Sequence, residues 1–424
     1  MRRFVRRLTF VSDGPHFGGA ERYIVAMAHT ARRRGIEPHI YWMPAPAADA
    51  DVFGAARAGD IRVTTAEPTR TRTTSGVIRE FRLMLADRRP DGLVINGSGR
   101  RRYWLLCWLT RRAGVPAVWV HQMVDGCDHR RLPPRWLGAR VEGLNWWRVP
   151  QALRHRLAAT AADAVVTLNA GDRERVARWQ GVSREKIRVI PHGVDCEYFR
   201  FDPAGRERMH RAWGISGTEA VRPFIVGTAG RLSAEKRVEL LIEATALLRE
   251  RGIPAVAAVA GRGAEQERLL QLVRERGATG AVRFDDFAGD MPAFYSGLDV
   301  FVLCSRTESF GLALAEAMAC ERPVVATPTA GAMRQISHRH NGWQLSGWSP
   351  AELADALASM AADPAGRRRM GRNGRQSVIR QFSIDLTLER TLRALRGAPD
   401  RSSPLRWPGM NEAPFVSMGA EDLA

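Results

Sequence analysis

The sequence predicts an α/β protein with two doubly wound parallel sheets. Short apolar runs alternate with longer amphipathic stretches through both halves of the 424-residue chain. This alternation is typical of buried parallel strands that are joined by helices. It stops over residues 201–222, which are polar and contain Pro and Gly, and then it starts again. We therefore expect an N-terminal domain over residues 1–200, a linker over 201–222 and a C-terminal domain over 223–382.

The first half alternates regularly apart from residues 44–74, which are rich in Ala, Thr and Arg. Its apolar runs predict strands at residues 6–12, 37–43, 61–64, 92–96, 115–120, 164–168 and 187–190. The stretches between them predict helices at residues 20–33, 76–86, 103–112, 151–161 and 172–180.

The second half repeats the pattern without repeating the sequence. Strands are expected at residues 223–228, 254–260, 281–287, 298–305, 323–327 and 341–345. Helices are expected at residues 238–251, 264–276, 291–297, 312–320, 350–362 and 365–382. Ser383 is a typical N-cap, so a further helix should cover residues 383–396. Residues 397–424 mix Pro, Ser, Gly and Asp and predict a disordered tail.

The composition narrows the class of protein. The net charge is +19, which suits contact with nucleic acid, anionic lipid or phosphorylated substrates, unless it reflects only a general preference for Arg. No nucleic-acid motif is present, so we expect no nucleic-acid partner. The five scattered cysteines have no metal-binding spacing and form no disulfide framework, which suits a reducing, cytoplasmic compartment. No run of eighteen apolar residues is present, so we expect no transmembrane helix.

A turn in the second half has the features of a phosphate site. Gly230 to Lys236 follow an apolar run and lead into a helix, with Arg231 at the end of the strand and Lys236 in the first helical turn. A cation is unfavourable at a helix N-terminus unless an anion binds there. The alternative is that both cations are surface residues that pair with Glu235 or Glu239.

Two carboxylates follow the strand at 298–305. Glu308 lies in the loop at its carboxyl end, where ligands bind in open parallel sheets. Glu316 lies in the middle of the apolar stretch 312–320, and a buried carboxylate there needs a hydrogen-bond donor. It either accepts from ligand hydroxyls or faces solvent on a narrow strip of the helix.

The first half offers weaker signals. Gly18 and Gly19 precede a helix and would let a ligand approach the backbone, although tight turns also favour glycine. His121 lies at the end of a predicted strand, on the side of the sheet where ligands bind. It either contacts a ligand or is a capping residue at the edge of the core. Asp125 follows four residues later and could orient His121 or an acceptor.

These residues together resemble the retaining glycosyltransferases of family four, which have the GT-B fold. The match rests on Glu308 and Glu316 with seven residues between them, on the turn at 230–236, and on the Pro-Val-Val strand at 323–325. Pro191 to Asp195 resemble the segment that leads into the interdomain connection of that family. The resemblance covers residues 6–396 and is densest from 223 to 328.

The resemblance implies a role for each candidate. Arg231 and Lys236 would contact the donor diphosphate, Glu308 and His121 the donor sugar, and Glu316 the ribose. The expected donor-binding set is Gly18, Gly19, Arg231, Lys236, Gly261, Phe310, Gly311 and Glu316, and the expected catalytic set is Glu308, His121, Arg231 and Lys236. The donor would be a UDP- or GDP-sugar. We expect no cofactor and no metal, because no Asp-x-Asp motif lies near the two cations.

The chain also departs from the family pattern. Arg334 occupies the position of the usual acid after the Pro-Val-Val strand, which leaves room for a donor with an extra negative charge. Asp285 and Asp286 lie where the family commonly has a glycine beside the base. The sugar and the base therefore stay open.

The segment from Cys127 to His155 alternates arginines with tryptophans. Such a segment suits contact with anionic lipid or with an anionic acceptor, unless the tryptophans pack inward. The residues on this acceptor or membrane side are Asp125, Arg130, Arg131, Arg135 and Trp136. We expect a cytoplasmic enzyme at the inner face of the membrane that uses a glycan or lipid-linked acceptor in cell-surface glycan or glycolipid synthesis. The alternatives are another GT-B sugar-nucleotide enzyme, such as an epimerase, and a basic binding protein without catalysis.

Overall fold

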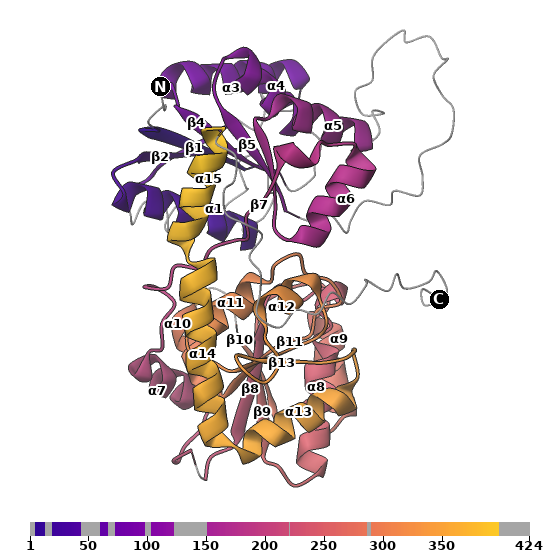
Figure 1. Cartoon of the computed structure of the whole chain (residues 1–424). Helices are drawn as coiled ribbons and strands as arrows, with labels where there is room; N and C mark the ends of the chain where they lie inside the picture. The colour runs from indigo at the N-terminus through magenta and orange to yellow at the C-terminus, as the bar shows by residue number, and fades with distance from the viewer. Residues whose placement is uncertain are drawn as a thin grey trace, which may run out of the picture.

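Two parallel sheets, one in each half of the chain, form the framework of the computed structural model (Figure 1). This confirms the predicted fold class. The structure describes residues 5–12, 19–43, 60–66, 73–97, 103–122, 151–219, 221–285 and 290–397. The expected tail at 397–424 lies almost wholly outside these ranges.

The first sheet has seven strands in the order β3-β2-β1-β4-β5-β6-β7. Every described pair is parallel, as expected for strands that are joined by helices. The strands are β1 (Arg7–Ser12), β2 (Glu37–Trp42), β3 (Arg62–Thr65), β4 (Gly92–Gly97), β5 (Ala117–His121), β6 (Ala164–Thr167) and β7 (Ile187–Val189).

Helices cover both faces of this sheet. One face packs against α1 (Gly19–Arg33) and α15 (Ile384–Leu395), the helix expected after Ser383. The other face packs against α3 (Thr74–Arg88), α4 (Tyr103–Arg112), α5 (Gln151–Ala161) and α6 (Ala170–Gln180). Alternating residues of the central strands therefore enter two different apolar layers.

The second sheet has six strands in the order β10-β9-β8-β11-β12-β13. The strands are β8 (Phe224–Ala229), β9 (Ala255–Ala260), β10 (Val282–Asp285), β11 (Val300–Leu303), β12 (Val324–Ala326) and β13 (Trp343–Gln344). One face packs against α8 (Glu239–Glu250), α9 (Gln266–Glu275) and α13 (Pro350–Ala362). The other packs against α10 (Met291–Gly297), α11 (Leu312–Ala319) and α14 (Pro364–Phe382).

The end of the chain crosses from the second sheet to the first (Figure 1). Helix α14 packs against α11, and α15 then packs against α1. At the crossing Ser383 pairs with Val194 and caps α15. The Arg375 guanidinium donates to the carbonyls of Cys196 and Phe199, so α14 also holds the chain that leaves the first domain.

The structure differs from the expectation in two helices. Residues 201–222, expected as a broken linker, contain helix α7 (Pro203–Ala212), which Pro203 begins and which packs against α10. Helix α12 (Ala330–Gln335) was missed because it is short; Thr329 caps it. The domain limits themselves stay predictions.

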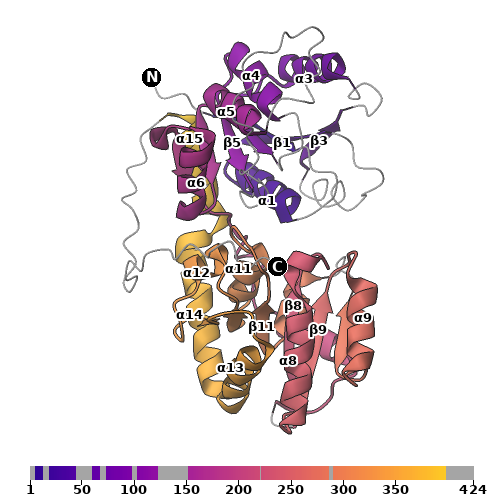
Figure 2. The ribbon, with the colours of Figure 1, turned by 90° about the vertical axis from the view of Figure 1, so that its right-hand side faces the viewer.

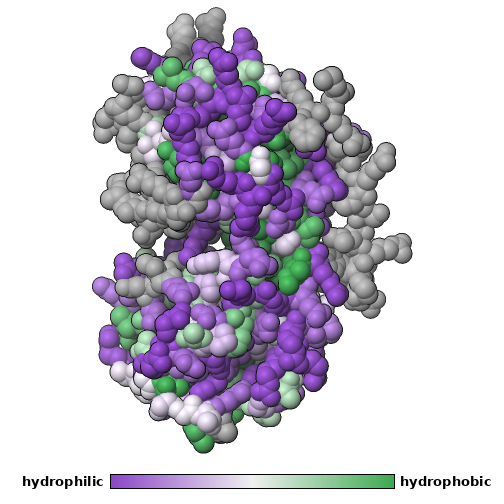
Figure 3. Space-filling model, turned by 90° about the vertical axis from the view of Figure 1, so that its left-hand side faces the viewer, coloured by the Kyte–Doolittle hydropathy of each residue, from purple (hydrophilic) through white to green (hydrophobic). Residues whose placement is uncertain are grey.

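The surface is largely hydrophilic. Figure 3 shows one face of the molecule, with hydrophobic residues in small groups and a hollow between the upper and lower lobes. Within the described ranges, no helix is long and apolar enough to cross a membrane.

Candidate functional site

Three loops meet where β8, β11 and β12 of the second sheet end. Residues 230–236 follow β8, residues 304–311 follow β11, and residues 327–329 lead from β12 into α12. Because β11 lies between β8 and β12, the three loops lie side by side at one edge of the sheet. This edge faces the first domain (Figure 2).

Lys236 and Glu308 form an ion pair between the first two of these loops. Ser305 donates from its hydroxyl to the same carboxylate oxygen of Glu308 at 3.1 Å. The Arg306 N–H donates to the carbonyl of Glu235 at 2.8 Å, which ties the two loops together. The side chains of Lys236 and Glu308 are 26% and 16% exposed, so the pair is open to a ligand. The structure thus brings together two of the predicted catalytic residues.

Arg231 lies on the same turn, and its side chain is 68% exposed. Its guanidinium is 3.9 Å from Glu235, which is a weak contact. The sequence predicted Lys236 in the first turn of the helix that became α8, and this prediction was wrong. Lys236 ends a separate 3₁₀ turn, Ala234–Lys236, because Arg237 adopts a left-handed conformation with φ 49° before α8 begins.

Gly261 follows β9 beside this turn, and its position admits no side chain. A Cβ there would lie 1.9 Å from the carbonyl oxygen of Gly230. The two backbones therefore approach each other closely, and the turn beside the predicted phosphate site keeps its shape only with glycine.

The backbone of the Glu308 loop is fixed through its carbonyl groups. The Glu308 carbonyl accepts from the Gly331 N–H at 2.9 Å, and the Phe310 carbonyl accepts from the Gln335 side chain. A Cβ at Gly331 would lie 2.2 Å from the Phe310 carbonyl oxygen, so glycine is required there too. Two hydrogen bonds from α12 thus fix the loop backbone. Gly311 adopts φ 83° and directs the chain into α11.

Glu316 is buried and does not lie on a solvent-facing strip of α11. The Tyr295 hydroxyl donates to its carboxylate at 2.7 Å. Burial raises the pKa of Glu316, while the charge of Arg22 on α1 and the Tyr295 hydrogen bond act against that rise. The Glu316 carboxylate therefore has a protein donor and a cation from the first domain nearby.

The first domain reaches this edge at the start of α1. A Cβ on Gly19 would lie 3.5 Å from Leu312 at the start of α11, so the two helix starts face each other. The other predicted residues of this region lie outside the described residues: Gly18, Asp125, Arg130, Arg131, Arg135 and Trp136.

His121 ends β5 as predicted, but it is buried within the first domain. Its Nε2 lies 3.1 Å from the Gln180 side-chain amide, and its ring meets the edge of His155 at 5.0 Å. These two partners of His121 both belong to the first domain.

A buried polar chain that the sequence did not reveal leads toward the Glu308 loop. The Gln122 side-chain amide donates to Asn96 Oδ1, and the Gln122 side-chain oxygen Oε1 lies 2.7 Å from His192 Nε2. The His192 ring lies 4.1 Å from the ring of Tyr23 and 5.9 Å from that of Phe310. His192 belongs to the Pro191–Asp195 segment noted in the sequence, but the sequence pattern did not indicate that the His192 side chain is buried.

Asn169 was also missed. It lies two residues after the end of β6, caps α6, and donates to the backbone carbonyl of Ser309 in the second domain. The sequence signal was present, because Asn169 ends an apolar run and Asp172 follows three residues later.

Arg334 lies on α12 with an Nε that has no hydrogen-bond partner among the described residues. Burial and then the charge of Arg390 on α15 lower the pKa of Arg334 to about 10. A desolvated guanidinium beside another cation favours an anion nearby.

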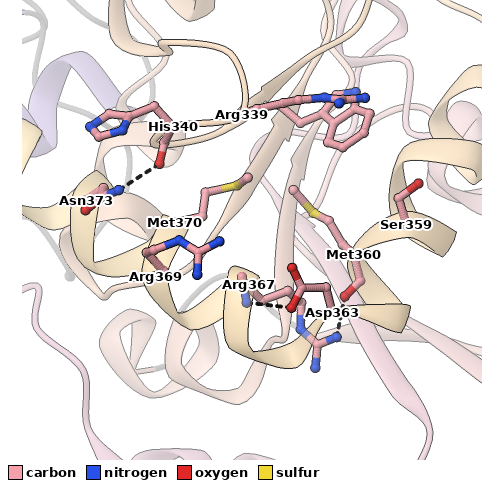
Figure 4. A pocket seen from close by; sticks show the side chains of 11 residues that line it. Arg339, His340, Ser359, Met360, Asp363, Arg367, Arg369, Met370 and Asn373 are labelled. Carbon is pink, nitrogen blue, oxygen red and sulfur yellow. Dashed lines mark hydrogen bonds between the residues drawn. The ribbon is translucent and has the colours of Figure 1, made fainter.

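A separate cavity of about 530 Å³ lies between α13, α14 and the turn before β13 (Figure 4). The Arg339 guanidinium stacks on Trp343 at 4.6 Å there, and Asn373 donates to the His340 carbonyl. This turn precedes its strand, so the cavity lies at the opposite end of the sheet from the Lys236–Glu308 pair.

Two family models match consecutive parts of the chain. Residues 17–198 match the model Glycosyltransferase Family 4, and residues 213–377 match Glycosyl transferases group 1. The matched residues span most of both sheets and include Lys236, Glu308 and Glu316. The chain belongs to this family of glycosyltransferases, and the resemblance inferred from the sequence is confirmed.

Individual relatives agree with this assignment. A D-inositol 3-phosphate glycosyltransferase of Actinosynnema mirum is 27% identical over 90% of this chain and 93% of its own length. A D-inositol 3-phosphate glycosyltransferase of Pseudarthrobacter chlorophenolicus is 33% identical over 51% of this chain. That alignment spans about half of the relative, 52% of its length. The Anabaena protein HepE, solved in complex with UDP-glucose, superposes with a TM-score of 0.73 at 20% identity, covering 92% of this chain and 99% of HepE. The GT-B fold is therefore confirmed.

The buried polar chain predicts a pH-dependent stability. Burial lowers the pKa of His192 from 6.5 to about 3, so the unfolded state takes up this proton first as the pH falls. The stabilisation from the neutral ring is complete above pH 6.5 and is lost as the pH falls toward 3. Between about pH 7 and pH 5, this proton uptake should lower the free energy of unfolding of the parent by roughly 2 kcal/mol. In His192→Asn this part of the loss should be absent, which urea unfolding at the two pH values measures. An equal loss in the parent and the variant would show that His192 is not buried in its neutral form.

Proposed function

We propose that this protein transfers a sugar from a nucleoside diphosphate sugar to an acceptor hydroxyl, with retention of the anomeric configuration. The bond between the sugar C1 and the diphosphate oxygen breaks, a bond from C1 to the acceptor oxygen forms, and the acceptor proton leaves with the diphosphate. The observation that carries the proposal is the Lys236–Glu308 pair at the carboxyl ends of β8 and β11.

Lys236 and Arg231 would bind the diphosphate. Negative charge grows on the leaving diphosphate as the C1 bond breaks, and fixed cations stabilise that charge more in the transition state than in the ground state. Lys236 is already held by Glu308, and Arg231 is exposed and able to reach a ligand. When the diphosphate replaces Glu308 as the ion-pair partner of Lys236, the Glu308 carboxylate becomes available to the donor sugar.

Glu316 would accept hydrogen bonds from the ribose hydroxyls. Tyr295 holds the carboxylate from within the protein, and Arg22 provides positive charge from the first domain.

The donor base stays open between uridine and guanosine. Relatives from Mycobacterium tuberculosis are described as GDP-mannose-dependent phosphatidylinositol monomannoside mannosyltransferases, which favours a lipid-linked or inositol-type acceptor and a role in glycolipid synthesis. The Nε of Arg334, which has no hydrogen-bond partner among the described residues, supports an additional anionic group on the donor or acceptor.

His121 and the start of α1 would contribute the first domain's side of the site. Within this proposal His121 acts from a rigid position, because Gln180 and His155 fix its ring. An epimerase on the same fold would release a changed sugar nucleotide without an acceptor product, and NMR of the products distinguishes the two reactions.

We expect Arg231→Ala and Lys236→Ala each to lower turnover at least about tenfold, or roughly 1.4 kcal/mol of transition-state stabilisation. Both variants should fold, because neither side chain belongs to an apolar cluster. Arg268→Ala is a matched control, because this cation is also exposed and paired with carboxylates of the same domain. Steady-state transfer assays decide, and parent-like turnover in both variants would remove the phosphate assignment.

Glu316→Gln should weaken binding of the nucleoside diphosphate, because charge-assisted hydrogen bonds to hydroxyls are worth about 1.5–3 kcal/mol each. Tyr295→Phe is the matched comparison, since it removes the internal donor and leaves the carboxylate in place. We expect it to lower the melting temperature with a smaller effect on affinity. Isothermal titration calorimetry tests both, and unchanged affinity in Glu316→Gln would assign this residue a purely structural role.

The described part of the first domain also supports contact with an anionic membrane. Helices α4 and α5 pack side by side (Figure 2) and contain no acidic residue. They expose Trp108, Leu153 and Leu157 by 42–47%, and Arg112 stacks on Trp108 at 5.1 Å. Exposed indole and leucine beside cations suit the headgroup boundary of an anionic bilayer.

We therefore expect the protein to sediment with anionic vesicles, but not with zwitterionic ones, and less so as salt rises. Trp108→Ser and Arg112→Gln should each reduce the bound fraction. Arg339→Gln is the control, because Arg339 also stacks on a tryptophan but lies at the far end of the second domain. Equal sedimentation with both vesicle types would contradict the membrane contact.

A further inference from the structure

Asn169 makes hydrogen bonds in both domains from one buried side chain. Its Oδ1 accepts from the Asp172 N–H at 2.8 Å, which caps α6. Its Nδ2 donates to the Asp172 carboxylate at 2.8 Å and to the carbonyl of Ser309 in the second domain, also at 2.8 Å. Asn169 is 4% exposed and Ser309 is 6% exposed. Water therefore competes little for the interdomain bond, and its geometry is well defined.

The Ser309 carbonyl is the middle one of three consecutive carbonyls that the structure holds. The flanking carbonyls, of Glu308 and Phe310, accept from Gly331 and Gln335 of the same domain. The middle carbonyl accepts from Asn169 of the opposite domain. The conformation of the loop that carries Glu308 thus depends on the first domain being in place.

This bond also sets the direction of a backbone donor. In a planar trans peptide the carbonyl and the following N–H point in opposite directions. When Asn169 holds the Ser309 carbonyl, the Phe310 N–H points away from α6. The structure gives that N–H no hydrogen-bond partner among its described residues. It is therefore free to donate to an anionic ligand beside Glu308.

We propose that Asn169 is a positioning residue for sugar transfer, which couples the seating of the first domain to the shape of the Glu308 loop and to the direction of the Phe310 N–H. The proposal rests on the proposed function. Asn169 acts through the loop backbone and does not itself contact the donor.

The test must separate the interdomain bond from the helix cap. Asn169→Ser keeps an oxygen that caps α6 but has no amide to reach Ser309, because Ser and Asn are both good N-caps. Asn169→Asp also keeps the cap, but it turns a carboxylate toward the Ser309 carbonyl. Thr73→Ala is the matched control for a lost cap, because Thr73 caps α3 of the same domain through the Gly76 N–H at 3.1 Å.

Two measurements are made on the full chain. We expect hydrogen exchange of the amides at 306–311 to become at least about fivefold faster in Asn169→Ser, while the α6 amides exchange as in the parent. We expect kcat to fall about tenfold in Asn169→Ser and further in Asn169→Asp. Thr73→Ala should change neither quantity, although it lowers the melting temperature.

Unchanged exchange at 306–311 in both Asn169 variants would overturn the proposal, and so would faster exchange with parent-like kcat. A rise in exchange over α6 alone would also overturn it, since it would reduce Asn169 to a helix cap. The exchange measurement needs no substrate. If the parent transfers no sugar from any donor, the proposed function fails, and the exchange data still show whether Asn169 orders the loop.

Discussion

The crossing of the last helices fixes how the two sheets face each other. Helix α14 is packed in the second domain, α15 buries Leu388 and Leu392 in the first, and one apolar cluster runs through both. Its packing is close at Gly92, where a Cβ would lie 3.1 Å from Leu395. Because this cluster is continuous, the carboxyl ends of the two sheets meet in one arrangement, and contacts such as Asn169 to Ser309 can form.

In the ligand-free site, the charged side chains are paired with groups of the protein itself. Glu308 is neutralised by Lys236, and Glu316 accepts from Tyr295. A nucleoside diphosphate brings its own negative charge and so can replace Glu308 as the partner of Lys236. The surrounding backbone does not need to change for this exchange, since Gly331, Gln335 and Asn169 already hold the loop.

The sheets and one edge of the site could be predicted from the sequence, because strand periodicity and chain direction are local properties. That is why Glu308, Arg231 and Gly261 could be placed after the carboxyl ends of strands from the sequence, whereas Lys236 was expected in the first turn of the following helix and lies in a separate 3₁₀ turn. Partners distant in the chain could not be predicted in this way. Tyr295 was read only as part of a short helix, and Asn169 fell in the turn between the strand at 164–168 and the helix at 172–180, because hydrogen bonds across 21 and 140 residues leave no periodic pattern. The missed helices α7 and α12 are short, and caps and tertiary packing rather than periodicity define them.

The position of α15 has a consequence for synthesis of the chain. All seven strands of the first sheet have been made by Val189, but α15 begins only at Ile384. During translation the apolar surface that α15 covers, including part of α1, therefore stays open until nearly the whole second domain has emerged. The N-terminal domain cannot complete its folding first and then wait, as domains of a growing chain often do. A chain that stopped before residue 384 would lack α15 and would leave this apolar surface uncovered.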